Sequence, residues 1–149
     1  MKVKEAMTKN VKSVLPEMSV KDAMGVLLGL EIGTVPVIDK NGKLIGMFTE
    51  RDILANILPE YVASVGKFVY LENPKSVKNK VANLEKLKVE NVINKKFLVT
   101  IDEDATLCEA AHVMLTQGIK RIPVLNRAGK VAGIIVRSDV LKKLTEGQA

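Results

Sequence analysis

The sequence predicts an α+β protein in which two β-α-β-β-α repeats pack pseudo-symmetrically, with a helical insertion between them. Residues from about 11 to 58 are repeated without gaps 87 positions later: Pro36 and Pro123 are 123−36=87 apart, and Asp52 and Asp139 are 139−52=87 apart. A match at a fixed offset over this length indicates a duplicated structural unit. Each copy alternates β-prone runs with apolar residues at helical spacing. One copy alone is too small to bury both faces of its elements, so we expect the two to pack together.

Composition indicates the class of protein. Hydrophobic residues make up 47% of the 149 residues, enough for a sizeable core and too many for a disordered chain. The formal net charge, 23−17=+6, favours anionic partners such as nucleotides, nucleic acid or acidic proteins; a basic surface without a function fits equally well. Cys108 is the only cysteine, which excludes an intrachain disulfide. With no signal-peptide pattern and no apolar run of membrane-spanning length, we expect a cytoplasmic protein.

The first helix of each repeat is preceded by residues that typically begin a helix. It is expected after a β-prone run at residues 11–14 in the first copy and 97–101 in the second. Ser19 and Thr106 are the expected N-caps, and Glu109 completes a capping box with Thr106. The apolar face of each helix is predicted at Val20, Ala23, Met24, Leu27 and Leu28, and at Leu107, Ala110, Ala111, Met114 and Leu115.

A hairpin and a second helix complete each repeat. The hairpin strands are predicted at 34–38 and 44–48, and at 122–125 and 131–136. Gly42 and Gly129 stand where a hairpin turn needs a positive φ. The second helices are expected to begin near Glu50 and Arg137. Gly25, Gly29 and Gly33, spaced by four, are expected to let the first helix of the chain approach another backbone, in the module or in a dimer.

These elements predict a first repeat over residues 1–58, an insertion over 59–88 and a second repeat over 89–149. Within the insertion, Asn73 and Pro74 resemble an N-cap followed by a proline at the first helical position. An apolar stripe follows at Val77, Val81, Leu84 and Leu87. We expect an amphipathic helix that covers the module or a partner. Its lysines form a solvated face or, alternatively, a site for an anion.

The residues with most chemical promise lie where the second strand of each hairpin meets the following helix. Thr49 and Asp52 are placed so that a hydroxyl binds phosphate and a carboxylate accepts both hydroxyls of a ribose. The same two residues also suit a capping box, which on their own they favour. The second copy keeps Asp139 but replaces the hydroxyl with Val136. A pair that serves only as a cap has less reason to lose its cap and keep its acid.

The chain resembles the cystathionine-β-synthase (CBS) domain family, whose tandem pairs are called Bateman modules. The first copy carries the resemblance in Gly33-Thr34-Val35-Pro36-Val37-Ile38-Asp39, Gly42-Lys43-Leu44-Ile45-Gly46 and Thr49-Glu50-Arg51-Asp52. The second copy carries it in Ile119-Lys120-Arg121-Ile122-Pro123-Val124, Gly129-Lys130-Val131-Ala132-Gly133 and Asp139. The resemblance implies a regulatory module that binds AMP, ADP, ATP or S-adenosylmethionine, and commonly a homodimer. It also implies crossed sites, in which the threonine and aspartate of one repeat act with segments of the other.

Carried over to this sequence, the resemblance implies two unequal sites. Asp52 would hold the ribose, Thr49 the phosphate, Lys120 and Arg121 the phosphate charge, and apolar residues the adenine. Site A then comprises Thr49, Asp52, Leu98, Val99, Ile119, Lys120, Arg121 and Pro123. Site B, which we expect to be weaker because Val136 lacks a hydroxyl, comprises Val11, Lys12, Ile32, Thr34, Pro36, Arg137 and Asp139.

Other functional classes have less support in the sequence. No constellation of catalytic residues is recognisable, so we do not expect an enzyme or a cofactor. Cys108 and His112 are four residues apart on one helix, but two ligands do not make a metal site, and we expect no metal. The alternative function is a nucleic-acid-binding regulator that uses the basic insertion, although few aromatic residues are present for base stacking. The sequence does not identify the nucleotide, the regulated partner or the pathway.

Overall fold

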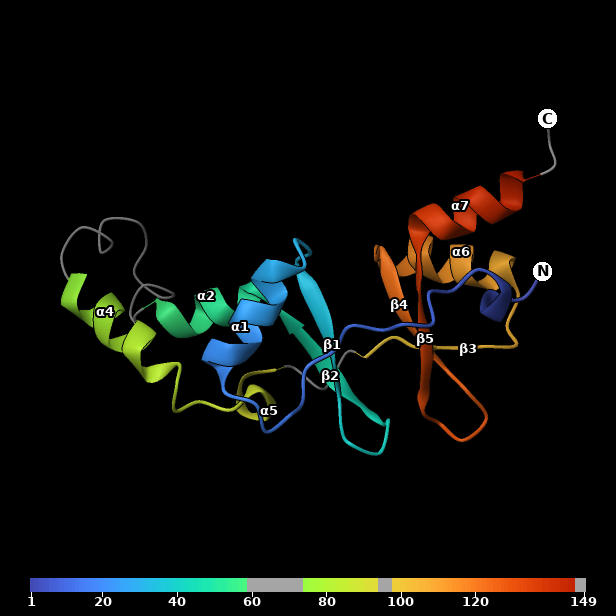
Figure 1. Ribbon diagram of the computed structural model, residues 1–149. Helices are drawn as coiled ribbons and strands as arrows, with labels where there is room; N and C mark the ends of the chain where they lie inside the picture. The colour runs from blue at the N-terminus through green and yellow to red at the C-terminus, as the bar shows by residue number, and fades with distance from the viewer. Residues whose placement is uncertain (59–73, 94–97, 147–149) are drawn as a thin grey trace. The chain divides into compact units, whose positions relative to one another are not determined.

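The computed structural model describes residues 1–58, 74–93 and 98–146, and confirms the mixed α+β class (Figure 1). The chain forms two compact units, which do not coincide with the two sequence repeats. Unit 1 contains residues 1–12, 38–44 and 97–149, and unit 2 contains residues 13–37 and 45–96. The boundaries of the repeats at 58 and 89 describe the sequence and stay a prediction.

Unit 2 packs helices around a two-stranded sheet. Its elements are α1 (Val20–Gly29), β1 (Thr34–Ile38), β2 (Leu44–Thr49), α2 (Glu50–Ile57), α4 (Pro74–Asn83) and the short α5 (Val89–Val92), with the β1–β2 turn assigned to unit 1. The core of unit 2 combines Leu27 of α1, Val35 and Val37 of β1 and Phe48 of β2, all fully buried. The predicted apolar period of α1 places Val20, Ala23 and Leu27 in this core and leaves Leu28 exposed.

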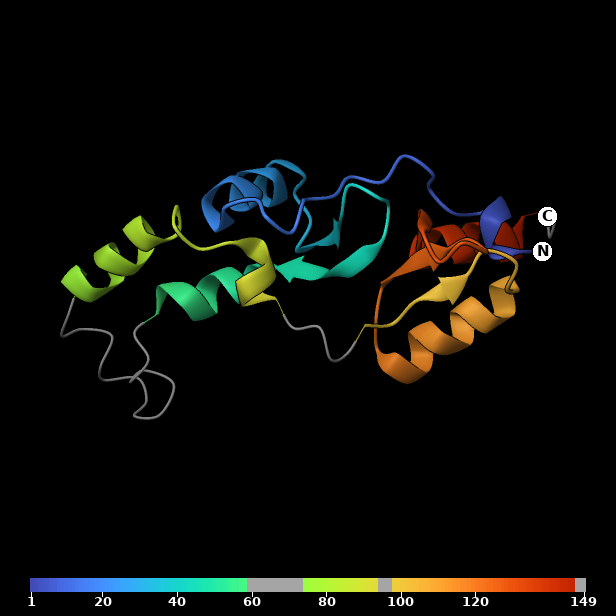
Figure 2. The same ribbon diagram turned by 90° about the horizontal axis from the view of Figure 1, so that it is seen from below.

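Unit 1 contains a three-stranded sheet in the order β3-β4-β5, seen from a second direction in Figure 2. Its elements are the 3₁₀ turn η1 (Val3–Glu5), β3 (Ile101–Asp102), α6 (Leu107–Gln117), β4 (Arg121–Leu125), β5 (Val131–Val136) and α7 (Arg137–Thr145). Strand β4 is parallel to β3 and antiparallel to β5, with Arg121 opposite Val136 and Pro123 opposite Ile134. Leu107, Met114, Ile122 and Ile135 are among the buried side chains between the sheet and its helices.

The predicted helix starts and turns are confirmed. The hydroxyl of Ser19 accepts from the amide of Asp22 at 3.1 Å, and Thr106 and Glu109 form a capping box. Gly42 and Gly129 have φ of 85° and 77°, as the turns require. Each turn is closed by an equivalent side chain: Asp39 accepts two backbone amides, at 2.9 Å each, and Asn126 accepts two, at 2.9 and 3.0 Å. Asp39 and Asn126 are 126−39=87 apart, so the repeat conserves the turn in detail.

The predicted first strands are mostly wrong. Residues 11–14 form no strand; Val14 alone makes a parallel bridge to Val37. In the second copy the strand is only Ile101–Asp102, and Phe97 lies outside the described residues. The β-prone composition of these runs was a weak signal, because strand formation depends on pairing with a neighbouring strand and not on composition alone.

The insertion is helical from Pro74, as predicted. Its predicted apolar stripe is only partly buried: Leu84 is buried and Leu87 packs against the core of unit 2, whereas Val81 is 44% exposed. The predicted cap Asn73 and the aromatics Tyr61, Phe68 and Tyr70 lie outside the described residues. Within the described chain no backbone closely approaches Gly25 or Gly29, because a Cβ added at either residue would meet no atom within 4 Å. The alternative, a close approach in a dimer, stays a prediction.

The segment that leads each repeat packs in the core formed by the other repeat. Val3 is fully buried in the core of unit 1, and Val89 is fully buried in the core of unit 2. Their backbones bond in the same way: the Val3 amide donates to the Ala105 carbonyl at 2.8 Å, and the Val89 amide to the Met18 carbonyl at 2.9 Å. The acceptors are 105−18=87 apart and the donors 89−3=86 apart. The leading segments are therefore exchanged reciprocally, which is why the compact units differ from the repeats.

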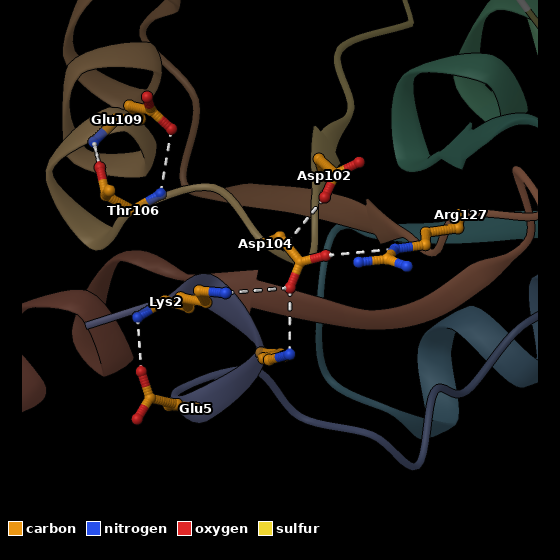
Figure 3. Close-up of polar contacts among 8 residues, drawn as sticks. Lys2, Glu5, Asp102, Asp104, Thr106, Glu109 and Arg127 are labelled. Carbon is orange, nitrogen blue, oxygen red and sulfur yellow. Dashed lines mark hydrogen bonds and ion pairs between the residues drawn. The ribbon is translucent and has the colours of Figure 1, made fainter.

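An ion cluster fixes the leading segment in unit 1 (Figure 3). The carboxylate of Asp104 lies 3.0 Å from the ammonium of Lys4, 3.5 Å from that of Lys2 and 3.9 Å from the guanidinium of Arg127. The hydrogen bond from Lys4 holds the pKa of Asp104 below its ordinary value, and the same contact raises the pKa of Lys4. The cluster thus ties residues 2 and 4 to the chain just before α6.

Candidate ligand-binding site

In unit 2, Thr49 and Asp52 form a complete capping box at the start of α2. The Thr49 hydroxyl accepts from the Asp52 amide at 3.2 Å, and the Thr49 amide donates to Asp52 Oδ2 at 2.9 Å. The hydroxyl also lies 3.0 Å from Oδ2 as a donor. Both side chains are half-buried. The capping role is therefore present, and the box uses Oδ2 of Asp52 and not Oδ1.

In unit 1, the equivalent helix start has lost its cap. Val136, the N-cap residue of α7, makes no side-chain cap. The first amide of the helix is nevertheless satisfied in the same way in both units: Arg137 donates to the Lys120 carbonyl at 2.9 Å, and Glu50 donates to the Gly33 carbonyl at 3.1 Å. Asp139 is half-buried near this helix start. Its carboxylate forms no capping box with Val136.

A basic hollow of about 330 Å³ lies beside the start of α7 in unit 1. Its lining comes from the start of β4 and the first turns of α7, namely Lys120, Arg121, Val136, Arg137, Ser138 and Leu141. The three cationic residues lie close together because Arg121 pairs with Val136 across the sheet and the Arg137 amide donates to the Lys120 carbonyl. No acidic residue lines the hollow, so its electrostatic character favours an anion.

The other residues predicted for site A are found as follows in unit 1. Ile119 is half-buried, and its carbonyl accepts from Nη2 of Arg137 at 3.4 Å. Pro123 is buried within β4. Leu98 and Val99 are half-buried, and Val99 packs against the core.

Residues predicted for site B are divided between the units. Val11, half-buried, and Lys12, exposed, belong to unit 1, as do Arg137 and Asp139. Ile32 and Thr34 are half-buried in unit 2, and the carbonyl of the buried Pro36 accepts from the Val14 amide at 3.0 Å. Site A is divided likewise, with Thr49 and Asp52 in unit 2 and its other members in unit 1. The composition of both sites stays a prediction.

The sequence did not predict all members of the basic hollow. Arg137, assigned from the resemblance to site B, lines the same hollow as Lys120 and Arg121 of site A. Ser138 and Leu141 were not considered for either site. A signal for them existed, because residues just after the second hairpin strand are held beside the start of the first strand by the antiparallel register.

Two properties of the described residues concern other classes of site. Among residues 1–58, 74–93 and 98–146, no three His, Cys, Asp or Glu side chains are grouped as metal ligands would be. Over the same residues, no helix has both the length and the apolar character needed to cross a membrane.

The fold and these helix starts define a tandem-repeat α+β module. The model of the CBS domain family matches the chain twice, at residues 3–59 and 89–146. The chain therefore belongs to the CBS domain family, as the resemblance in the sequence suggested.

Similar proteins include stand-alone pairs and parts of longer chains. A CBS domain-containing protein of Dictyostelium discoideum is 29% identical over 144 residues, which is 95% of this chain and 90% of that protein. An inosine-5'-monophosphate dehydrogenase of Aquifex aeolicus is 31% identical over 143 residues, 95% of this chain but only 24% of the enzyme. The match to the enzyme thus covers about a quarter of its length.

Solved structures share the fold over nearly the whole chain. CBSX2, solved in complex with AMP, has a TM-score of 0.72 and 26% identity, covering 99% of this chain and 98% of CBSX2. A conserved protein of Geobacillus kaustophilus has a TM-score of 0.77 and 27% identity, covering 98% and 97%.

Proposed function

We propose that this chain is a regulatory module that binds an adenosine-containing ligand, one of AMP, ADP, ATP or S-adenosylmethionine, and performs no catalysis. The observation that carries the proposal is the basic hollow of unit 1, which gathers Lys120, Arg121 and Arg137. The likeness to CBSX2, a protein solved with AMP, supports an adenine nucleotide as the ligand.

In this proposal each residue of site A has one task. Asp52 accepts the ribose hydroxyls through the carboxylate oxygen that its capping box leaves outside. Thr49 supports that geometry and donates its hydroxyl proton to phosphate in place of Asp52 Oδ2. Lys120 and Arg121 neutralise phosphate, and arginine adds paired hydrogen bonds. Leu98, Val99, Ile119 and Pro123 supply the apolar contacts to adenine.

Site B is proposed as the weaker site. Its helix start has Val136 in place of a hydroxyl, so it lacks one phosphate ligand. Asp139 supplies the carboxylate, and Val11, Lys12, Ile32, Thr34 and Pro36 supply the remaining contacts. A measured stoichiometry of two AMP sites of equal affinity per chain contradicts this asymmetry.

A regulatory module needs a surface that a partner binds. We propose that the chain forms a homodimer through its helices. Four leucines are well exposed on equivalent helices, at 59% for Leu28, 81% for Leu115 and 58% for both Leu54 and Leu141. They recur at 115−28=87 and 141−54=87, so both units present the same apolar positions. Ligand binding that favours one arrangement of the repeats would then change this surface. We propose a cytoplasmic location, which the single cysteine supports.

The test is calorimetric titration of the full chain with AMP, ATP and S-adenosylmethionine, for the native protein, Asp52→Ala and Asp139→Ala. Asp52→Ala is expected to weaken binding about tenfold or more, because each hydrogen bond to a charged group contributes about 1.5–3 kcal/mol. Glu109→Ala is the matched control, since it breaks the equivalent capping box of α6 outside the proposed sites. Unchanged affinity in Asp52→Ala contradicts the site A assignment. Steeply salt-dependent oligonucleotide binding without any effect of adenine nucleotides would instead favour a nucleic-acid-binding function of the basic insertion.

A further inference from the structure

The geometry points to Arg137 as the third cation of a single anion-binding hollow, and hence to a ligand with a polyphosphate group, a nucleoside di- or triphosphate. This inference rests on the proposed function and chooses among its ligands. It also moves Arg137 from the predicted weaker site to the residues that bind phosphate.

Hydrogen bonds to the backbone just before β4 fix the position of Arg137. Its amide donates to the Lys120 carbonyl at 2.9 Å, and its Nη2 lies 3.4 Å from the Ile119 carbonyl. These contacts hold the first residue of α7 against the chain that enters β4. Lys120 and Arg121, the last residue before β4 and the first within it, therefore line the same hollow as Arg137.

The three positive charges of the hollow are not neutralised within the described part of unit 1. Lys120, Arg121 and Arg137 take part in no ion pair there, whereas Lys2, Lys4 and Arg127 share the carboxylate of Asp104. Like charges held together repel one another, and a multiply charged anion removes that repulsion. A single phosphate monoester carries about −1.5 to −2 at neutral pH, so three cations are matched better by a di- or triphosphate.

The equivalent positions of unit 2 show that this charge is specific to one copy. Gly33, Thr34 and Glu50 stand 87 residues before Lys120, Arg121 and Arg137, since 120−33=87, 121−34=87 and 137−50=87. Three cations in one copy thus correspond to two neutral residues and one acid in the other. The shared fold does not require the cations, because the same backbone bond from Glu50 to Gly33 forms without them. Three cationic residues also disfavour S-adenosylmethionine, because its sulfonium is itself a cation.

The experiment is calorimetric titration of the native chain, Arg137→Gln and Lys142→Gln with ATP, ADP, AMP, S-adenosylmethionine and inorganic tripolyphosphate. Lys142→Gln is the matched control, because it removes one positive charge from an exposed position of α7 outside the hollow. We expect native affinity to fall in the order ATP, ADP, AMP, with tripolyphosphate displacing ATP. Arg137→Gln should weaken ATP about tenfold or more and AMP by a smaller factor, while Lys142→Gln changes each by less than about twofold. Thermal melts of both variants check that they fold.

The outcomes separate this inference from the proposed function. If AMP binds as tightly as ATP, or S-adenosylmethionine binds best, the polyphosphate inference is wrong and the module still binds an adenosine ligand. If Arg137→Gln behaves like Lys142→Gln while Asp52→Ala abolishes binding, the role of Arg137 is wrong and site A stands. If none of the adenosine compounds binds, the proposed function itself fails.

Discussion

The backbone carbonyl oxygen of Thr8 lies only 2.6 Å from the place that a Cβ would take on Gly133. Two hydrogen bonds fix this approach, from the Thr8 amide to the Ile134 carbonyl at 2.8 Å and from the Ile134 amide to the Thr8 carbonyl at 2.9 Å. The sulfur of Met7 is nearly as close to the same position, at 2.8 Å. Strand β5 therefore accepts the leading segment of the chain only because residue 133 has no side chain.

Gly133→Ala should destabilise the protein by about 1–3 kcal/mol, the usual cost of overpacking, because the clash is with backbone that cannot rotate away. Gly25→Ala is the matched control, since a Cβ there meets no atom within 4 Å. In the interior of α1 it should stabilise by about 0.5–1 kcal/mol. Urea unfolding followed by circular dichroism measures both. Equal midpoints for the two variants would show that the close approach does not constrain residue 133.

Val3→Ala should destabilise unit 1 by about 1–3 kcal/mol, because it removes two buried methyl groups and leaves a cavity in a fully buried position. Val81→Ala, at a position 44% exposed, should change stability by less than about 0.5 kcal/mol. Hydrogen exchange locates the effect, which we expect as faster exchange in α6 and β5. Faster exchange confined to α1 and β1 would contradict the packing of Val3 in unit 1.

The capping boxes allow a reciprocal exchange of side chains between the repeats. Thr49→Val should destabilise by about 0.5–2 kcal/mol because α2 loses its N-cap. Val136→Thr should stabilise, since Asp139 already stands at the third position of α7 and can complete a new box. Thermal denaturation of both variants gives the two signs. If Thr49→Val raises the melting temperature, the capping box at the start of α2 does not stabilise the protein.

The Asp104 cluster predicts a pH dependence. The pKa of Asp104 is lowered in the folded protein by the hydrogen bond from Lys4, so the folded state binds a proton there less readily than the unfolded chain. Its contribution to stability is therefore present above the unfolded value of about 3.9 and is lost as the pH falls through the lower folded value. Asp104→Asn should lower the urea midpoint at pH 7, and its difference from the native chain should shrink toward pH 3.

High salt should reduce the same difference, because the cluster is solvated and screened. Glu17→Gln is the control, since Glu17 is exposed and forms no ion pair within the described residues. A difference between Asp104→Asn and the native chain that stays constant from pH 7 to pH 3 would contradict the lowered pKa.

Local signals in the sequence predicted most elements of the fold. Ser19, Thr106 and Glu109 cap helices where expected, and Gly42 and Gly129 form the turns, because these roles depend only on neighbouring backbone. The strands of both hairpins agree with the prediction to within one residue. A second copy of each pattern strengthened the prediction of these elements, since the same false signal rarely recurs at a fixed offset.

Long-range packing was less predictable. The leading segments repeat at an offset of 86, since 88−2=86 and 89−3=86, one less than the offset of the remaining repeat, so a gapless comparison passes over them. The sequence shows two apolar residues, Val3 and Val89, but does not show in which core each is buried. The basic hollow was hidden for a similar reason: Arg137 joins Lys120 through an antiparallel register that no local pattern of residues specifies.

The reciprocal exchange of leading segments also sets an order in which the protein is completed during synthesis. Unit 2 draws only on residues 13–37 and 45–96, so its parts are all present once that stretch has left the ribosome. Unit 1 needs residues 1–12 together with residues 97 onward. Residues 1–12, with the apolar Val3 among them, must wait unpaired until β5 and α7 of the same unit are made. Domains made early generally fold first, so unit 1, which carries the basic hollow, is expected to become native after unit 2.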